Sequence, residues 1–221
     1  MKHTKSLQEL QNSFSGVYEW FSSLKNISLS ELPTDKTAHI IVDMINGFVK
    51  EGALSSKEVL SINNSVANFA AVCTNNNIQN IAFADSHSKE SVEFQTFPVH
   101  CLDGTYESEV TDEIKKSSDF TLVKKNSTNG FIEPQFADII TKTNKNTFIV
   151  TGDCTDMCVI QFAMTLKADF NRRNIPSRVI VPYELTATCS MPNHEPELAE
   201  IMALYIMSTN GIEIVKNITN D

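Results

Sequence analysis

Short apolar runs alternate with helical stretches along most of this chain, and this alternation limits the fold more than any other feature. The runs are rich in valine and isoleucine, which favour strands, and they predict strands at residues 38–42, 80–84, 121–123, 146–150, 178–181 and 212–215. Apolar side chains at helical spacing predict helices at 56–74, 135–143, 156–173 and 195–209. Apolar strands joined by helices are typical of a parallel sheet covered on both faces. We therefore expect a doubly wound, Rossmann-like α/β domain with a mainly parallel six-stranded sheet and its site at the carboxyl ends of the strands.

An amphipathic helix is expected ahead of this domain. Residues 6–24 carry apolar side chains at helical spacing, and a polar segment follows through Pro33. We therefore divide the chain into an N-terminal helix with its connecting segment, residues 1–37, and a main domain, residues 38–221. The apolar stripe of the helix could pack on its own domain or on a second subunit. The sequence leaves both alternatives open, and the second would make a homo-oligomer.

The composition argues against several kinds of partner. A formal net charge of -9 opposes binding to nucleic acid or to an anionic membrane. No apolar run approaches the ~20 residues that span a bilayer, and residues 1–11 lack the apolar centre of a signal peptide. The five cysteines are scattered and do not resemble a disulfide framework. We expect the protein in a reducing cytoplasm, with no nucleic-acid and no membrane partner.

Cys158 is the strongest candidate for a nucleophile. It follows an apolar run that ends at Gly152, where the side-chain period changes from two to 3.6 residues and predicts a strand, a tight turn and a helix. Cys158 would then lie in the first turn of the helix, where free N–H groups and the macrodipole favour a thiolate. Asp43 ends the first strand and Lys124 and Lys125 end the third, which adds a base and a cation. Each residue alone also fits an ordinary role: a buried cysteine, a capping aspartate, a solvated lysine.

A long segment without helical pattern, residues 85–106, carries a set of candidate metal ligands. Four side chains of the types that bind zinc, iron or manganese occur in it: Asp85, His87, Glu93 and His100. Two carboxylates and two imidazoles would leave coordination positions open for water or substrate, as a catalytic site does. His3 and His194 have no such neighbours in the sequence and are expected on the surface.

Three motifs make the chain similar to a known family. They read Asp-Met-Ile-Asn-Gly-Phe at 43–48, Lys-Asn-Ser-Thr-Asn-Gly-Phe at 125–131 and Gly-Asp-Cys-Thr-Asp-Met-Cys-Val at 152–159. Over roughly residues 38–216 the chain resembles the isochorismatase-like cysteine hydrolases, and within them the nicotinamidase (pyrazinamidase) group. The third motif is the most specific, because the family shows a glycine, a Thr-Asp pair and the nucleophilic cysteine at this spacing.

The resemblance implies a catalytic triad of Asp43, Lys125 and Cys158. Lys125 is chosen over Lys124 because it has the family's spacing to the following aromatic residue. The resemblance also implies a cis peptide bond before Cys154, which stands where the family usually has a small residue. The backbone N–H groups of Cys154 and Cys158 would form the oxyanion hole.

The four candidate ligands of the long segment resemble the metal site of the nicotinamidases. Some members carry a third histidine where this chain has Glu93. The resemblance implies one divalent ion, with zinc as the first choice and iron or manganese as alternatives, bound to the ring nitrogen of the substrate. Phe48 and Phe97 would pack against the ring from either side, although an aromatic at each position is equally consistent with core packing.

The implied activity is hydrolysis of nicotinamide to nicotinate and ammonia through a thioester on Cys158, a reaction of NAD salvage. Three alternatives stay open. The substrate could be another small amide or a carbamoyl compound, with the metal ligands serving only the loop. The chain could be a non-catalytic member that binds a ligand, or a thiol redox sensor that uses Cys154 and Cys158.

Overall fold

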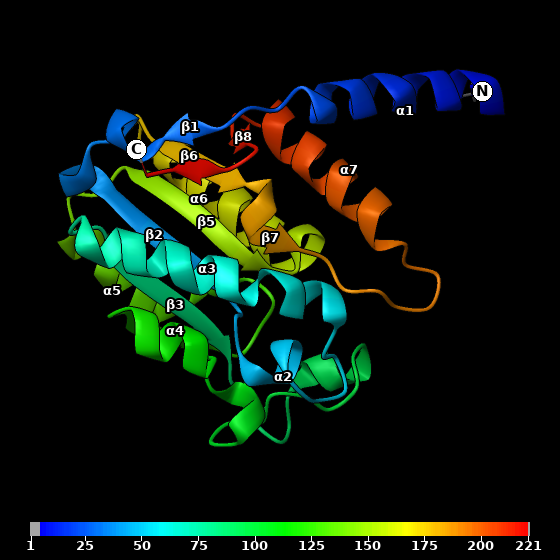
Figure 1. The fold of residues 1–221 in the computed structure, drawn as a ribbon. Coiled ribbons are helices and arrows are strands. Elements are labelled where there is room, and N and C mark those ends of the chain that lie inside the picture. The colour runs from blue at the N-terminus through cyan, green and yellow to red at the C-terminus, as the bar shows by residue number, and fades with distance from the viewer. Residues whose placement is uncertain (1–4, 221) are drawn as a thin grey trace.

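The computed structural model describes residues 5–220, and its centre is a sheet of parallel strands (Figure 1). The strand order is β4-β3-β2-β5-β6-β8. The strands are β2 (Thr37–Val42), β3 (Gln79–Asp85), β4 (Thr121–Lys125), β5 (Thr147–Asp153), β6 (Arg178–Pro182) and β8 (Glu213–Val215). The six predicted strands are therefore confirmed. This order reverses direction between β2 and β5, and such a switch point is where doubly wound sheets place their ligands.

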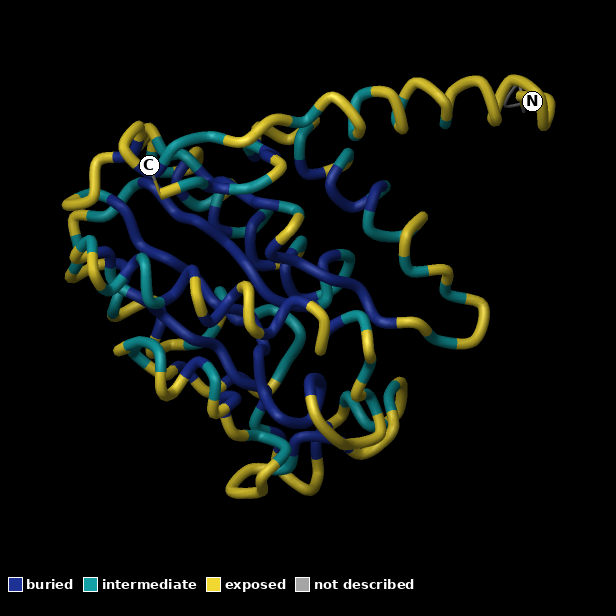
Figure 2. Tube along the Cα trace, viewed as in Figure 1, coloured by how far each residue is buried: buried dark blue, intermediate teal, exposed yellow. Residues whose placement is uncertain are grey.

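Helices cover both faces of the sheet, as predicted. On one face lie α2 (Asn46–Val49), α3 (Lys57–Asn75) and α4 (Asp112–Ser117), and on the other α5 (Pro134–Lys142), α6 (Ile160–Arg172) and α7 (Pro196–Thr209) (Figure 1). Every residue of β2 and of β5 is buried between these layers (Figure 2). Strands buried on both faces explain why the sequence shows continuous apolar runs rather than alternation.

Gly152 brings β5 close to β2 at the switch point. Its φ is +109°, and a Cβ atom built there would lie 1.9 Å from the carbonyl oxygen of Val42. Only glycine fits this approach, because any side chain would meet backbone that cannot move aside. The end of β5 is therefore held against the end of β2, and the segments that follow both strands begin side by side.

Several short elements were not predicted. β7 (Thr186–Ala187) adds a seventh strand that pairs in parallel with the end of β5, and β1 (Ile27–Ser28) pairs with β9 (Ile218–Thr219). The helices α2 and α4 were also missed. Elements of two to six residues carry too little periodicity to be seen in a sequence, and their pairing partners are distant in the chain. β7 matters to the site because it fixes the segment that follows it.

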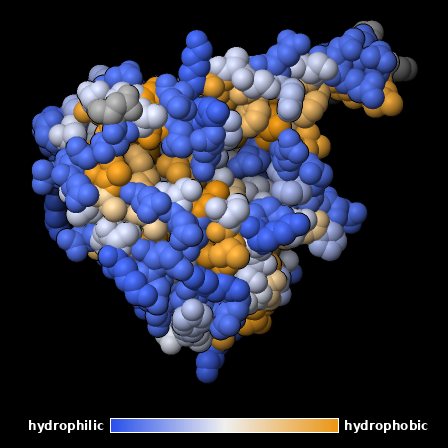
Figure 3. All heavy atoms as spheres, viewed as in Figure 1, coloured by the Kyte–Doolittle hydropathy of each residue, from blue (hydrophilic) through white to orange (hydrophobic). Residues whose placement is uncertain are grey.

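The N-terminal helix α1 (Leu7–Ser22) extends away from the body of the molecule (Figure 1). Its last turn is anchored on the main domain: Trp20 packs edge-on against Tyr205 of α7, and Phe21 packs against Tyr183. Figure 3 shows apolar side chains along the free part of the helix, where Leu7 is 73% exposed. The sequence left open whether this helix packs on its own domain or on a second subunit. Its last turn packs on its own domain. His3 lies outside the described residues.

Candidate active site

The three side chains expected to form a triad meet at the carboxyl ends of their strands. Lys125, the last residue of β4, places its Nζ 2.8 Å from Oδ2 of Asp43 and 3.7 Å from Sγ of Cys158. All three residues are buried. Lys124 is directed away from them, is exposed, and pairs with Asp103. Alternation of side chains along β4 explains the difference, because neighbouring residues of a strand point to opposite faces.

The strand register brings Asp43 and Asp85 together around the lysine. Asp85 pairs with Lys125 across β3 and β4, and its carboxylate contacts the Lys125 ammonium. Asp43 follows β2 with a φ of +55°, and its Oδ1 accepts a hydrogen bond from the backbone N–H of Asp85 at 3.1 Å. One buried cation is thus shared by two buried carboxylates.

Burial and this shared cation set the protonation of the cluster. Burial raises the pKa of Asp43 to about 7, against the opposing effect of Lys125. Burial would also raise the pKa of Asp85, but Lys125 and the nearby histidines hold it well below its usual range. The two carboxylates keep the pKa of Lys125 well above the ordinary value despite its burial. An acid with a pKa near neutrality is suited to accept and return a proton.

The surroundings of Cys158 differ from the sequence-based expectation in two ways, the type of helical turn and the direction of the thiol pKa. It lies in a π-helical turn, Thr155–Val159, between β5 and α6, rather than in an ordinary first helical turn. Burial raises the pKa of its thiol well above the usual value, and Lys125 opposes this effect only in part. Burial therefore opposes the resting thiolate that the sequence analysis expects at this position. The Asp153–Cys154 peptide bond is cis, as the resemblance implies.

A group of candidate metal ligands lies next to the triad. Asp85, His87 and His100 are buried and offer ligand atoms within 4.8 Å of one another. Nε2 of His87 is 3.5 Å and Nε2 of His100 is 3.7 Å from Oδ2 of Asp85. Glu93 is not part of this group, but its Oε2 lies 3.7 Å from Nε2 of His87 while its Oε1 accepts from the backbone N–H of Thr128.

This group fits a divalent metal ion. Nδ1 of His100 donates to the carbonyl oxygen of Pro98 at 2.8 Å, so the lone pair of the neutral ring lies on Nε2. Nδ1 of His87 is 3.2 Å from Oδ1 of Asn126, and its buried Nε2 has no hydrogen-bond partner among the described residues. Two imidazole nitrogens and one carboxylate oxygen, each held by an outer partner, are a typical donor set for zinc or iron.

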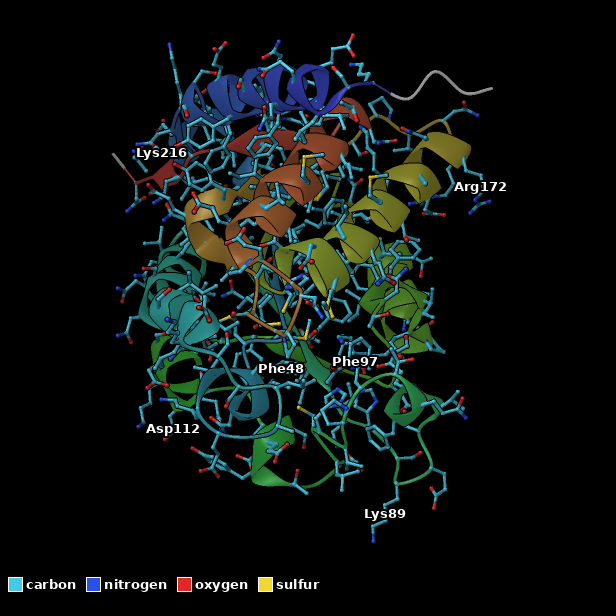
Figure 4. The ribbon with its side chains drawn as sticks, turned by 90° about the vertical axis from the view of Figure 1, so that its right-hand side faces the viewer. Phe48, Lys89, Phe97, Asp112, Arg172 and Lys216 are labelled. Carbon is cyan, nitrogen blue, oxygen red and sulfur yellow. The ribbon has the colours of Figure 1, made fainter. Side chains whose placement is uncertain are left out.

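A cavity opens beside the triad and the metal-ligand group. Cys158, Asp85 and His100 line it, together with Phe48 and Phe97 (Figure 4). The ring centroids of Phe48 and Phe97 are 5.8 and 6.3 Å from that of His100. Both aromatic residues proposed to contact substrate therefore face the same space as the candidate nucleophile.

Comparisons with known proteins agree with this geometry. The model of the isochorismatase domain family matches residues 37–210 of the chain. The chain belongs to the isochorismatase family. It is 28% identical over 209 residues to Nicotinamidase 1 of Arabidopsis thaliana, a match that covers 81% of this chain and 85% of the plant protein.

Solved structures of this family share the fold. A pyrazinamidase of Pyrococcus horikoshii in complex with zinc superimposes with a TM-score of 0.68 at 22% identity, over 82% of this chain and 99% of that one. The N-carbamoylsarcosine amidase of Thermoplasma acidophilum gives 0.66 at 25% identity, over 82% and 96% of the two chains. The family and its relatives make the chain an amide hydrolase.

The sequence analysis missed several residues that line the cavity of this protein. They are Leu54, Thr128, Asp153, Met157, Cys189 and Met191. Thr128, Asp153 and Met157 had a visible signal, because they stand in two of the quoted motifs, and Asp153 is also a charged residue at the end of an apolar strand. Cys189 and Met191 belong to the segment after β7, which no periodicity marks. His194 of this segment is not a plain surface residue as expected, because its Nε2 lies 2.7 Å from Oδ2 of Asp156.

Among residues 5–220, no helix combines the length and the apolar character that crossing a bilayer requires.

Proposed function

We propose that this enzyme hydrolyses nicotinamide to nicotinate and ammonia through a thioester on Cys158. One observation carries the proposal: a cysteine in contact with a lysine, which also pairs with an aspartate, lines a cavity whose wall includes Asp85 and His100, two members of a group that fits a metal. The similarity to the plant nicotinamidase supports the same substrate. Phe48 and Phe97 offer two apolar faces between which a flat ring can lie.

The proposed reaction uses Asp43 as its only proton carrier. Asp43 takes the thiol proton of Cys158, and the sulfur attacks the carboxamide carbon. The backbone N–H groups of Cys154 and Cys158 stabilise the oxyanion, where one such donor contributes ~10²–10³ in rate. Asp43 then protonates the leaving nitrogen, and ammonia departs. Finally, Asp43 accepts a proton from the water that attacks the thioester, and returns it to the sulfur as nicotinate leaves.

The metal in this proposal is a single divalent ion, with zinc as the first choice and iron or manganese as alternatives. Asp85, His87 and His100 would hold it, and Glu93 is a fourth candidate through its Oε2. When bound, the ion would act as a Lewis acid that holds the pyridine nitrogen of the substrate. Lys125 contacts both Asp85 of this group and the nucleophile, and its charge holds the pKa of Asp85 well below its usual range, which favours the ionised form that a ligand needs.

The cellular setting follows from the same chemistry. The reaction needs the Cys158 thiol, and all five cysteines are free in the structure. We place the enzyme in the reducing cytoplasm, where its product would feed NAD salvage.

A second candidate substrate is a small carbamoyl compound. The similarity to the N-carbamoylsarcosine amidase, together with the polar Asp153 in the cavity, favours this alternative over the others. In that case the metal-ligand group would only order its loop. Metal content separates the two candidates, since a fully active preparation without a bound divalent ion would favour the carbamoyl substrate.

The test is ammonia release from nicotinamide by the purified, metal-loaded protein. Cys158→Ala should abolish turnover, because the nucleophile is lost. Cys73→Ala is the matched control: Cys73 is also buried, but it lies in α3 outside the cavity and should leave turnover unchanged. A folded, metal-loaded wild type that releases no ammonia from nicotinamide would exclude this substrate.

A further inference from the structure

Asp153 is a buried carboxyl group that the proposed reaction does not use. It is the last residue of β5, is 1% exposed, and lines the cavity together with Cys158. Its Oδ2 has no hydrogen-bond partner among the described residues. Its Oδ1 has only the thiol of Cys154 nearby, at 3.9 Å from Sγ. Buried polar atoms without partners are rare in folded proteins, because each costs about 1–3 kcal/mol.

The surroundings of Asp153 favour the neutral form of its carboxyl group. Burial raises its pKa well above the ordinary value, and the nearby Asp43, Cys189 and Asp85 act in the same direction. Lys125 opposes the shift, but its charge is already shared by Asp43 and Asp85. A neutral carboxyl group differs from a carboxylate because it offers both an O–H donor and a carbonyl acceptor.

The position of Asp153 in the chain places its carboxyl group near the residues proposed to act on the C–N bond of the substrate amide. Its neighbour in the chain is Cys154, whose backbone N–H is a proposed oxyanion donor. The charge of Asp43, the proposed acid for the leaving nitrogen, acts on the pKa of Asp153. An amide attacked by Cys158 must direct its oxygen toward Cys154 and its nitrogen toward Asp43. The nitrogen of such an amide would therefore approach the unpaired carboxyl of Asp153.

We propose that Asp153 determines specificity for unsubstituted amides, by accepting a hydrogen bond from the NH₂ group of the substrate while Cys158 attacks the adjacent carbon. This inference rests on the amide hydrolysis proposed above, but not on nicotinamide, because a carbamoyl group carries the same NH₂. Esters lack the N–H donor and cannot form this hydrogen bond with Asp153. The cavity thus distinguishes an amide from an ester of the same ring.

The experiment compares nicotinamide with methyl nicotinate, which has the same ring and carbonyl group but no N–H. Asp153→Leu should lower kcat/KM for nicotinamide about 10- to 100-fold, the value of one lost hydrogen bond in a buried site. The value for methyl nicotinate should change little. Asp153→Asn keeps an acceptor oxygen and should preserve the preference for the amide. If Asp153→Leu lowers both substrates equally, the role of Asp153 is structural and the proposal is wrong.

Two controls keep this result interpretable. Thermal unfolding of both variants shows whether they fold, and Asp153→Val replaces Asp153→Leu if the larger side chain does not fit. If the wild type hydrolyses neither nicotinamide nor the ester, a second readout is used. This readout is the rate at which iodoacetamide and iodoacetone alkylate Cys158, measured by peptide mass spectrometry. Only iodoacetamide carries an NH₂ group, so Asp153→Leu should lower its rate relative to iodoacetone. An unchanged ratio would overturn the inference even where the proposed substrate has failed.

Discussion

The two sides of the active site are built from different chemistry. The charged side comes from the ends of β2, β3 and β4 and the segment after β3, and consists of Asp43, Asp85, His87, His100 and Lys125. The sulfur side comes from the turn after β5 and the segment after β7, and consists of Cys154, Met157, Cys189 and Met191. On the charged side every group has a partner of fixed geometry. The sulfur side presents soft, polarizable atoms that adapt to the shape of a ligand.

This difference indicates that one set of residues sets the charges of the site and another set limits the shape of its cavity. In the proposed reaction the charged side would control proton transfer and metal binding, so single changes there should have large effects. The sulfur side limits the shape of the cavity, so volume-conserving changes there should have small effects. The following predictions test this contrast.

Loss of the shared cation should have the largest effect. Lys125→Met leaves Asp43 and Asp85 buried without their partner, and removing one member of a buried ion pair costs about 3–5 kcal/mol. Urea unfolding should show this loss, together with loss of turnover. Lys124→Met is the matched control, since Lys124 is exposed and its replacement should change stability by less than about 0.5 kcal/mol. Equal stability of the two variants would contradict the assigned role of the cation.

Loss of a metal ligand should come next. His100→Ala should weaken binding of a divalent ion more than about 100-fold, beyond the 10- to 100-fold typical of an outer-partner change. Metal content after dialysis and titration with zinc measure this. His194→Ala is the control histidine, because His194 pairs with Asp156 outside the metal-ligand group. Unchanged affinity in His100→Ala would remove His100 from the site. Glu93→Gln, measured beside them, shows whether the fourth candidate contributes.

A histidine on β2 should make stability depend on pH. His39 is buried between Asn80 and Thr151, and burial lowers its pKa from 6.5 to about 4. Between these values the unfolded chain binds a proton that the folded chain does not, so stability falls as pH decreases. From pH 7 to pH 5 this group should cost about 2 kcal/mol.

Urea unfolding of wild type and His39→Gln at both pH values isolates this contribution. The variant should lose about 2 kcal/mol less than wild type over this interval, since glutamine does not titrate. Parallel losses in the two proteins would show that His39 is not the group responsible.

A change on the sulfur side should have the smallest effect. Met191→Leu conserves volume at the cavity wall, so it should cost less than about 1.5 kcal/mol in stability and leave kcat nearly unchanged. The KM for nicotinamide is the quantity most sensitive to cavity shape and should shift by a few-fold at most. A loss of kcat as large as that of Lys125→Met would abolish the contrast between the two sides.

The strand-end residues of the charged side could be predicted from sequence because the sheet is regular. Apolar periodicity located β2, β4 and β5, and parallel strands place their carboxyl ends at one edge. Asp43, Lys125 and Cys158 therefore had to lie near one another once the strands were placed. The same reasoning could not find Cys189 or Met191, which reach the cavity only because β7 pairs with β5.

The sequence by itself determined the α/β architecture, the family motifs and the types of reactive side chain at the strand ends. Only the tertiary structure set the direction of their pKa shifts: burial raises the pKa of the Cys158 thiol and of Asp43, whereas local position near a helix start had favoured a thiolate. It also buried the carboxyl group of Asp153 and left its Oδ2 without a hydrogen-bond partner among the described residues. Periodicity is a local property of a chain, while desolvation and shared charges depend on everything that packs around a group.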